Sequence, residues 1–376
     1  MNLSFTEEQE ILRKFASDFL TEKFQKKLLK EMEASEEGYS AQIWKEMAEL
    51  GWMGLPFPEQ YGGTGMSVMD QMVLLEEMGR AAAQSPYFAT VILGAFPIYD
   101  FGSEEQKGKY LPEIIGGNMI LSLAVTEKDG GMQAASIEST AAKSGDGYVI
   151  NGSKLFAPFA HVADYILCVA RTDGKAEAEK GISVFIVPAK TAGLTCTVME
   201  SIAGKPCEVV FKDVKVGKDA LLGQENEGWK YIQATMRRAE VALCSEMAGL
   251  GQQALDMTVQ YAKDRKQFGR SIGSFQILQH YCADMFMELD GMKLNTYRAA
   301  WKLDEKLDCE EDVAMAKAWA AQASEKISGP AHQIHGAIGS TIEYDLHYYT
   351  RRMKALSLTF GDTKYYREII AQKMGL

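Results

Sequence analysis

The spacing of apolar residues divides the chain into a helical part, a part rich in short β-type runs, and a second helical part. From Phe5 to about Met119, apolar positions recur every three or four residues, which is typical of amphipathic helices. Thr6 followed by Gln9 forms a capping box, which predicts that a helix begins there. We expect helices at 7–33, 40–50, 67–79, 87–101 and 104–115, most of them separated by Gly and Pro.

Short runs of β-branched and aromatic residues replace the helical pattern near Met119. Turn residues separate several of these runs, among them Gly145-Asp146-Gly147 and Asn151-Gly152. Eight short strands within about 95 residues favour a small barrel or sandwich. We expect the strands at 120–125, 136–144, 148–151, 154–159, 165–171, 182–188, 194–200 and 207–214.

Helical spacing returns at about Glu227 and continues to Leu376. One long run ends near Tyr261, and the last helix is expected to begin near Asp362. Between them we expect helices at 275–306, 310–328 and 344–353. The predicted fold is therefore multidomain α+β, with an all-α domain at 1–119, a small β domain at 120–222 and an α-helical bundle at 223–376.

The two longest helical runs are expected to meet at a bend, because Gly269 and Gly273 interrupt the pattern there. The bend carries Arg265, Lys266 and Arg270. Guanidinium groups suit phosphate oxygens, and a glycine lets the backbone approach a ligand closely. An ordinary helical hairpin whose charges are solvated accounts for the same residues about equally well.

Composition narrows the classes of function. The 376 residues include 40 Lys and Arg against 51 Asp and Glu, a net charge of −11, which argues against a nucleic-acid partner. No run of about 18 apolar residues predicts a membrane span, and the N-terminus lacks the pattern of a secretory signal. The six cysteines form no Cys-x-x-Cys pair and the five histidines have no metal-ligand spacing. We expect reduced thiols, no metal site and a cytoplasmic location.

Five segments, in this order, resemble the acyl-CoA dehydrogenase family, and the resemblance covers essentially the whole chain. They are Leu55-Pro-Phe-Pro-Glu-Gln-Tyr-Gly-Gly63, Leu74-Leu-Glu-Glu-Met-Gly79, Ala124-Val-Thr-Glu127 with Gly130-Gly131, Arg265-Lys-Gln-Phe-Gly269 with Gln276, and Gln333-Ile-His-Gly336-Ala-Ile-Gly339 followed by Glu343-Tyr344. The resemblance implies an FAD enzyme that takes a hydride from Cβ and a proton from Cα of an acyl-CoA. It also implies a dimer or tetramer that passes electrons to an electron-transferring flavoprotein.

The resemblance assigns cofactor contacts residue by residue. Val125 and Thr126 would face the flavin pyrimidine edge, and Phe156 stands where the family often has a tryptophan near the flavin ring. Gly131 would let a loop close over the cofactor. Arg265 and Phe268 would reach the pyrophosphate and adenine side of FAD across a subunit interface. The remaining contacts would come from Gln276, Gln333, Gly336 and, as either a helix N-cap or a cofactor contact, Asp362.

Three departures from the family pattern affect the chemistry. The loop that usually reads Gly-Ser/Thr-Asp reads Gly131-Met132-Gln133, so a hydroxyl is missing. Pro158 replaces a threonine expected near flavin N5, which removes an N–H and a hydroxyl. Phe360 stands where the family commonly has its catalytic glutamate, although its backbone N–H could still polarise a thioester carbonyl.

Some relatives place the glutamate on the long helix after the β domain, where this chain has Ala239. Glu240 lies one residue on, about 100° around the helix, and Glu246 lies two turns on, within about 20° of the same face. Both are candidates for the catalytic base, and Asp362 is a third, although a helix N-cap or a cofactor contact suits it better. Alternatively, one glutamate pairs with Arg237 or Arg238, and the other with a helix in the next layer.

Three functions remain open from the sequence. The leading one is an FAD-dependent acyl-CoA dehydrogenase. The second is an acyl-CoA flavoenzyme of the same fold that carries out an elimination on a substituted acyl-CoA. The third is one subunit of a heteromer whose partner supplies the base or part of the flavin contacts, which fits the changes at Met132, Pro158 and Phe360.

Overall fold

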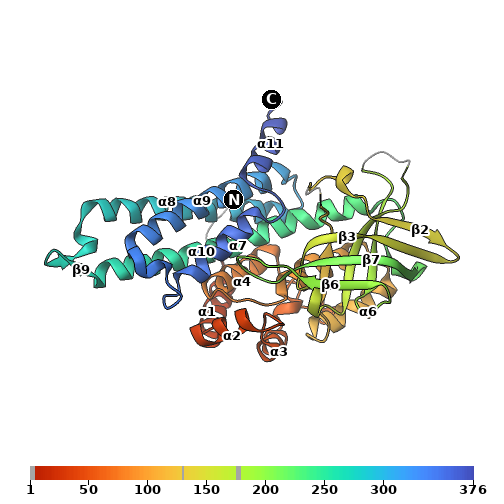
Figure 1. The fold of residues 1–376 in the computed structure, drawn as a ribbon, viewed down its shortest axis with the longest axis horizontal. Helices are drawn as coiled ribbons and strands as arrows, with labels where there is room; N and C mark the ends of the chain where they lie inside the picture. The colour runs from red at the N-terminus through yellow and green to blue at the C-terminus, as the bar shows by residue number, and fades with distance from the viewer. Residues whose placement is uncertain (1–4, 129–130, 175–178) are drawn as a thin grey trace. The chain divides into compact units, whose positions relative to one another are not determined.

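The computed structural model describes residues 5–128, 131–174 and 179–376, and these fall into two compact units. The first, here the helical unit, comprises Met1–Glu31, Ser67–Gln84 and Glu240–Leu376. The second, here the sheet unit, comprises Met32–Met66 and Ser85–Ala239. Figure 1 shows the elements of each. The expected order of helices, strands and helices is confirmed.

A mixed sheet forms the centre of the sheet unit, in the order β6-β7-β3-β2-β4-β5-β8, with β1 pairing in parallel with β4. Its core is apolar and includes Ile150, Cys168, Phe185, Val209 and Phe211. The strands are β1 (Leu121–Ala124), β2 (Thr140–Ser144), β3 (Gly147–Pro158), β4 (Tyr165–Arg171), β5 (Ile182–Pro188), β6 (Leu194–Val198), β7 (Pro206–Gly217) and β8 (Leu221–Leu222).

The predicted turn at Asn151-Gly152 is wrong. β3 runs without a break from Gly147 to Pro158, so the two strands expected there are one. Its pairing with β7 is interrupted between Ile150 and Gly152, and again between Lys154 and Ala157. Gly152, with φ +149°, absorbs the first irregularity because it has no side chain. The turn expected at 145–147 is confirmed, since β2 and β3 form an antiparallel hairpin there.

The helix expected at 87–101 is two helices of different kinds. The first, η3 (Phe88–Ala95), is a π-helix, and α5 (Phe96–Phe101) follows it with Pro97 in its first turn. Proline has no N–H for a helical bond, which favours a change of pitch at this point. Thr90 of η3 exchanges hydrogen bonds with the backbone of Leu121, so η3 lies against the start of β1. The sheet unit also contains α3 (Ala41–Glu49) and α6 (Glu104–Ile115).

Long helices build the helical unit. The single helix expected at 7–33 is two, α1 and α2, divided at Phe24, which is buried and leaves helical geometry. α1 begins with the expected capping box of Thr6 and Gln9. The helices are α1 (Glu7–Lys23), α2 (Lys26–Ala34), α4 (Val68–Arg80), α7 (Gly228–Asp264), α8 (Gln276–Asp304), α9 (Glu310–His335), α10 (Leu346–Leu358) and α11 (Thr363–Lys373), of which α2 and α7 also contribute residues to the sheet unit.

Two glycines set how closely α4 and α7 cross. A Cβ atom at Gly79 would lie 2.1 Å from the carbonyl oxygen of Glu246, and one at Gly249 would lie 1.8 Å from that of Glu76. Real Cβ atoms do not approach other atoms so closely, so both positions require glycine for this crossing.

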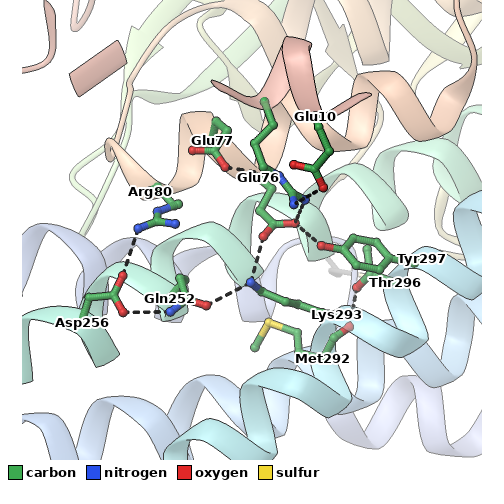
Figure 2. A network of polar contacts seen from close by, with 11 residues as sticks. Glu10, Glu76, Glu77, Arg80, Gln252, Asp256, Met292, Lys293, Thr296 and Tyr297 are labelled. Atoms are coloured by element: carbon green, nitrogen blue, oxygen red, sulfur yellow. Dashed lines mark hydrogen bonds and ion pairs between the residues drawn. The ribbon is translucent and has the colours of Figure 1, made fainter. Parts of the chain in front are cut away.

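A chain of polar contacts joins α4, α7 and α8 beside this crossing (Figure 2). Glu76 accepts a hydrogen bond from Tyr297 and lies 3.0 Å from Lys293 Nζ. Lys293 donates to Gln252, which donates to Asp256 at 2.9 Å. Glu76 and the neighbouring Glu77 are each 3% exposed, so this network places charge inside the helical unit.

Candidate functional site

The end of β1 presents polar groups that have few partners. Val125 is buried, and the carbonyl of Thr126 accepts a hydrogen bond from Leu155 N–H at 2.8 Å. The Thr126 hydroxyl contacts the sulfur of Met132 at 3.8 Å, a weak partner. Within residues 5–128, 131–174 and 179–376, the Thr126 N–H has no hydrogen-bond acceptor. Two donors are therefore available to a ligand.

Phe156 lies next to this end of the strand, directly after Leu155. The residue is 59% exposed, and its φ of +58° is left-handed, which is rare for a bulky side chain. This conformation occurs within the second irregularity of β3. Nearby, Ser122 Oγ donates to the carbonyl of Pro158 at 2.7 Å and fixes the position of that proline. Backbone strain that exposes an aromatic ring is typical of ligand sites.

Beneath the same strand end lies a buried ion pair that the sequence reasoning missed. Lys154 is fully buried, and its Nζ lies 2.5 Å from Glu127 Oε1 and 3.3 Å from the carbonyl oxygen of Val125. Burial by itself would raise the pKa of Glu127, but Lys154 and hydrogen bonds from Ser139 hold it below its usual value. The available signal was a lysine at a core-facing position of a predicted strand.

The bend after α7 is a tight hairpin of β9 (Lys266–Gln267) and β10 (Arg270–Ser271). Its two central residues, Phe268 and Gly269, both have positive φ, as a type I′ turn requires. Phe268 is 90% exposed. Arg265 is also exposed, so the cation and the ring expected at the cofactor both reach solvent in this chain.

The segment after α9 also presents its expected residues to solvent. Gln333 and Gly336 are exposed, as is Gln276 at the start of α8. Below Gly336, the buried His335 stacks on Tyr261 with ring centroids 4.5 Å apart, and this contact ties the segment to the end of α7. Burial lowers the pKa of His335, which favours a neutral ring.

The segment that carries Phe360 is held by Tyr366. The Tyr366 hydroxyl lies 3.1 Å from the Phe360 carbonyl oxygen and 2.9 Å from Glu240 Oε1. Phe360 has φ +63°, so this turn too is left-handed. Asp362 accepts a hydrogen bond from Tyr365 N–H at 2.9 Å and caps α11, which is the N-cap role expected from sequence.

The two glutamates of α7 have different partners. Glu246 is 3% exposed and accepts a hydrogen bond from Nε of Arg352 on α10. Glu240 is half-buried and accepts from a neutral phenol, that of Tyr366. Arg238, one of the two arginines considered as a partner for these glutamates, pairs with Asp100. Pairing of one glutamate with a neighbouring helix layer is seen for Glu246.

Gly131 lies in a loop where a Cβ atom would approach Ser136 Oγ to 2.3 Å. Gly130 lies outside the described residues.

Membrane-spanning helices are not found among the described residues, because none of their helices has the length and apolar character that a span needs.

Three family models match the chain, namely the acyl-CoA dehydrogenase N-terminal domain (residues 6–118), middle domain (122–214) and C-terminal domain (226–375). The chain belongs to the acyl-CoA dehydrogenase family. It is 34% identical over 380 residues to a probable acyl-CoA dehydrogenase, YngJ, of Bacillus subtilis, with 100% of both chains covered. It is 32% identical to the caffeyl-CoA reductase–Etf complex subunit CarC of Acetobacterium woodii, with 98% of both covered.

Among solved structures, butyryl-CoA dehydrogenase from Megasphaera elsdenii matches with a TM-score of 0.92, 30% identity and full coverage of both chains. The expected fold, flavoprotein class and activity are confirmed. This acyl-CoA dehydrogenase uses FAD and acts on an acyl-CoA at the Cα–Cβ bond. Dehydrogenation is favoured over elimination, the second of the functions left open by the sequence.

The residues at the end of β1 fit a flavin. An isoalloxazine presents carbonyl oxygens and ring nitrogens along its pyrimidine edge, and these accept hydrogen bonds. The free N–H and the weakly bound hydroxyl of Thr126 supply donors, and the exposed ring of Phe156 supplies an aromatic surface. This donor set and this surface meet the needs of the cofactor that the family uses.

Proposed function

We propose that Thr126 and Phe156 hold the flavin ring of this acyl-CoA dehydrogenase and that Glu240 removes the Cα proton of the substrate. When bound, FAD supplies the acceptor for the hydride that leaves Cβ. The Thr126 N–H and hydroxyl would bind the pyrimidine edge, with Val125 completing the backbone there and Gly131 in the adjoining loop. The observation that carries this assignment is the free N–H and the weakly bound hydroxyl of Thr126 beside the exposed Phe156.

The nucleotide half of FAD would be held by the exposed residues of the helical unit. Arg265 supplies a fork of donors for phosphate oxygens, and Phe268 an exposed ring for the adenine side. Both would act on the cofactor of a second subunit, as the family resemblance implies. Gln276, Gln333 and Gly336 would complete this side, with Asp362 acting first as the N-cap of α11.

Glu240 is the better of the two candidate bases. A base must be reachable and must give up its bonds to accept a proton. Glu240 is half-buried and one of its partners is a neutral phenol, whereas Glu246 is buried against the guanidinium of Arg352. Breaking the pair of Glu246 and Arg352 would leave a largely buried cation without its carboxylate, which is costly. The backbone near Phe360 would polarise the thioester carbonyl.

The electron acceptor proposed for the chain is an electron-transferring flavoprotein, because a relative is named as a subunit of a complex with one. A homodimer or homotetramer in the cytoplasm completes the proposal.

Absorbance of the purified protein tests the flavin assignment. A yellow protein that bleaches anaerobically with one member of a panel of acyl-CoA esters is expected. Thr126→Val and Phe156→Ser should each weaken FAD binding about tenfold or more, in line with the loss of one or two ligand interactions. Thr195→Val, on β6, is the matched control and should bind FAD like the parent chain. Equal FAD affinity in all four proteins would contradict the assignment.

A second function is favoured by the absence of a carboxylate at both usual positions, Phe360 and Ala239. In that case a related subunit would supply the base, and the chain alone would bind FAD without bleaching. Co-expression with a related chain followed by bleaching would establish it. Bleaching by the chain alone would exclude it.

A further inference from the structure

The buried ion pair of Lys154 and Glu127 is not expected to add to the stability of the fold. Both charges are almost fully removed from water, and burying an ion pair typically stabilises a protein no more than apolar residues of the same size would. The pair nevertheless occupies the interior of the sheet unit, directly below the end of β1. Stability therefore does not account for the presence of this ion pair.

The pair holds the backbone on both sides of Thr126. Lys154 Nζ lies 3.3 Å from the Val125 carbonyl oxygen, before Thr126, and 2.5 Å from Glu127 Oε1, after it. Glu127 is held in turn by the N–H groups of Glu138 and Ser139, at 3.0 Å each. These contacts hold the Val125–Thr126 peptide in place from the interior of the sheet unit.

One peptide bond transmits the charge of Lys154 to the ligand side. The Val125 carbonyl and the Thr126 N–H belong to the same planar trans peptide, so they point in opposite directions. An ammonium at the carbonyl oxygen polarises that peptide and makes its N–H a stronger donor. This N–H has no acceptor in the described part of the chain.

We propose that Lys154 and Glu127 are positioning residues that set the redox potential of the bound flavin through the Val125–Thr126 peptide. The proposal rests on the flavin assignment made above. Negative charge gathers along the pyrimidine edge of a flavin when it is reduced, so a stronger donor there favours the reduced form. Lys154 raises the potential, and the carboxylate of Glu127 partly offsets it.

The two charges predict shifts of opposite sign, which a merely structural role does not. Lys154→Met removes the cation and should lower the midpoint potential. Glu127→Gln keeps the shape and an acceptor for the two N–H groups but removes the anion, and should raise it. We expect each shift to be about 30 mV, which for a two-electron couple is a tenfold change in the ratio of affinities for the two redox forms.

The experiment is a spectroscopic potential titration of the FAD-loaded proteins, with reference dyes, at constant pH. The double variant Lys154→Met/Glu127→Gln should return towards the parent potential. Lys143→Met is the matched control, because Lys143 pairs with Glu225 on the surface of the same unit and is 68% exposed. It should leave the potential unchanged. If Lys154→Met fails to fold, the upward shift of the midpoint potential expected for Glu127→Gln still tests the proposal.

Shifts of the same sign in both single variants, or no shift in Glu127→Gln, would overturn the proposal. FAD affinity, measured by fluorescence on the same samples, separates this failure from failure of the flavin assignment. If the chain binds FAD but the potentials do not move in opposite directions, only the role of the ion pair is wrong. If Thr126→Val and Phe156→Ser both leave FAD affinity intact, the flavin assignment on which the proposal rests is wrong.

Discussion

The hydroxyl of Tyr366 on α11 donates a hydrogen bond to Glu240 on α7, with 2.9 Å between the oxygen atoms. Burial, followed by the charge of Glu240, raises the pKa of Tyr366 well above its usual value, so the phenol stays protonated at neutral pH. The same hydroxyl lies 3.1 Å from the Phe360 carbonyl oxygen. One side chain thus joins the proposed base to the turn that carries the residue in the usual position of the base.

Glu240→Gln should slow bleaching of the flavin by acyl-CoA about 100-fold or more, because an amide cannot accept the Cα proton. Tyr366→Phe should slow it less than tenfold, and should lower the free energy of unfolding by about 1 kcal/mol through loss of the hydrogen bond that its hydroxyl donates. Stopped-flow absorbance gives the rates. A normal rate in Glu240→Gln would remove Glu240 as the base.

Glu246 and Arg352 should behave as a structural pair. Glu246→Leu and Arg352→Met should each lower the free energy of unfolding by about 3–5 kcal/mol, because each leaves one buried charge unpaired. The double variant should recover most of that loss. Urea unfolding followed by circular dichroism measures all three. Additive losses in the double variant would show that the two residues do not stabilise one another.

Glu76 and Glu77 are neighbours with opposite expected responses. Glu76→Gln should destabilise the chain by about 3 kcal/mol, since it leaves Lys293 without its carboxylate (Figure 2). Burial raises the pKa of Glu77 above its usual 4.5, so the folded state favours its protonated form. Ionisation of Glu77 therefore lowers stability as the pH rises from about 4.5 through the raised pKa.

Glu77→Gln removes this ionisation. The variant should match the parent chain near pH 4 and become the more stable of the two as the pH rises to 7. Urea unfolding at several pH values measures the difference. A variant that is less stable than the parent at pH 7 would mean that the contact with Arg13, at 3.7 Å, outweighs the cost of burial.

Phe268→Asn should weaken retention of FAD and leave the fold intact. Asparagine tolerates positive φ better than phenylalanine, so the turn should lose strain rather than shape. Gel filtration and FAD fluorescence should show loss of the cofactor at protein concentrations where the parent chain keeps it. Ile11→Ser removes another exposed apolar side chain, on α1, and should have no such effect.

The sequence predicts the elements well where local signals are strong. The capping box at Thr6, the hairpin at 145–147 and the N-cap at Asp362 were each predicted from a few residues and are present. Asn151-Gly152 is a strong turn signal that is overruled, because pairing with β7 continues on both sides of it. The division of the first helix at Phe24 depends on burial of that ring, which local spacing does not specify.

In the candidate site too, the features that the sequence does not predict are those that depend on tertiary packing. Exposure of Phe156 and Phe268 follows from left-handed backbone at a strand irregularity and a hairpin tip, which tertiary pairing creates. The partners of Glu240 and Glu246 come from α11 and α10, more than 100 residues away, and no pattern within α7 identifies them. The ion pair of Lys154 and Glu127 likewise joins two segments that are separate in the sequence, so neither segment alone predicts it.

The crossing of α4 and α7 restricts which amino acids the chain can carry at Gly79 and Gly249. Each glycine there faces the main chain of a glutamate that carries a polar network, Glu246 opposite Gly79 and Glu76 opposite Gly249. A single methyl group at either glycine would wedge the helices apart and dislocate both sets of charges together. Exchange of either glycine for alanine is therefore expected to disturb the packing of the two helices and the charged side chains beside it at the same time.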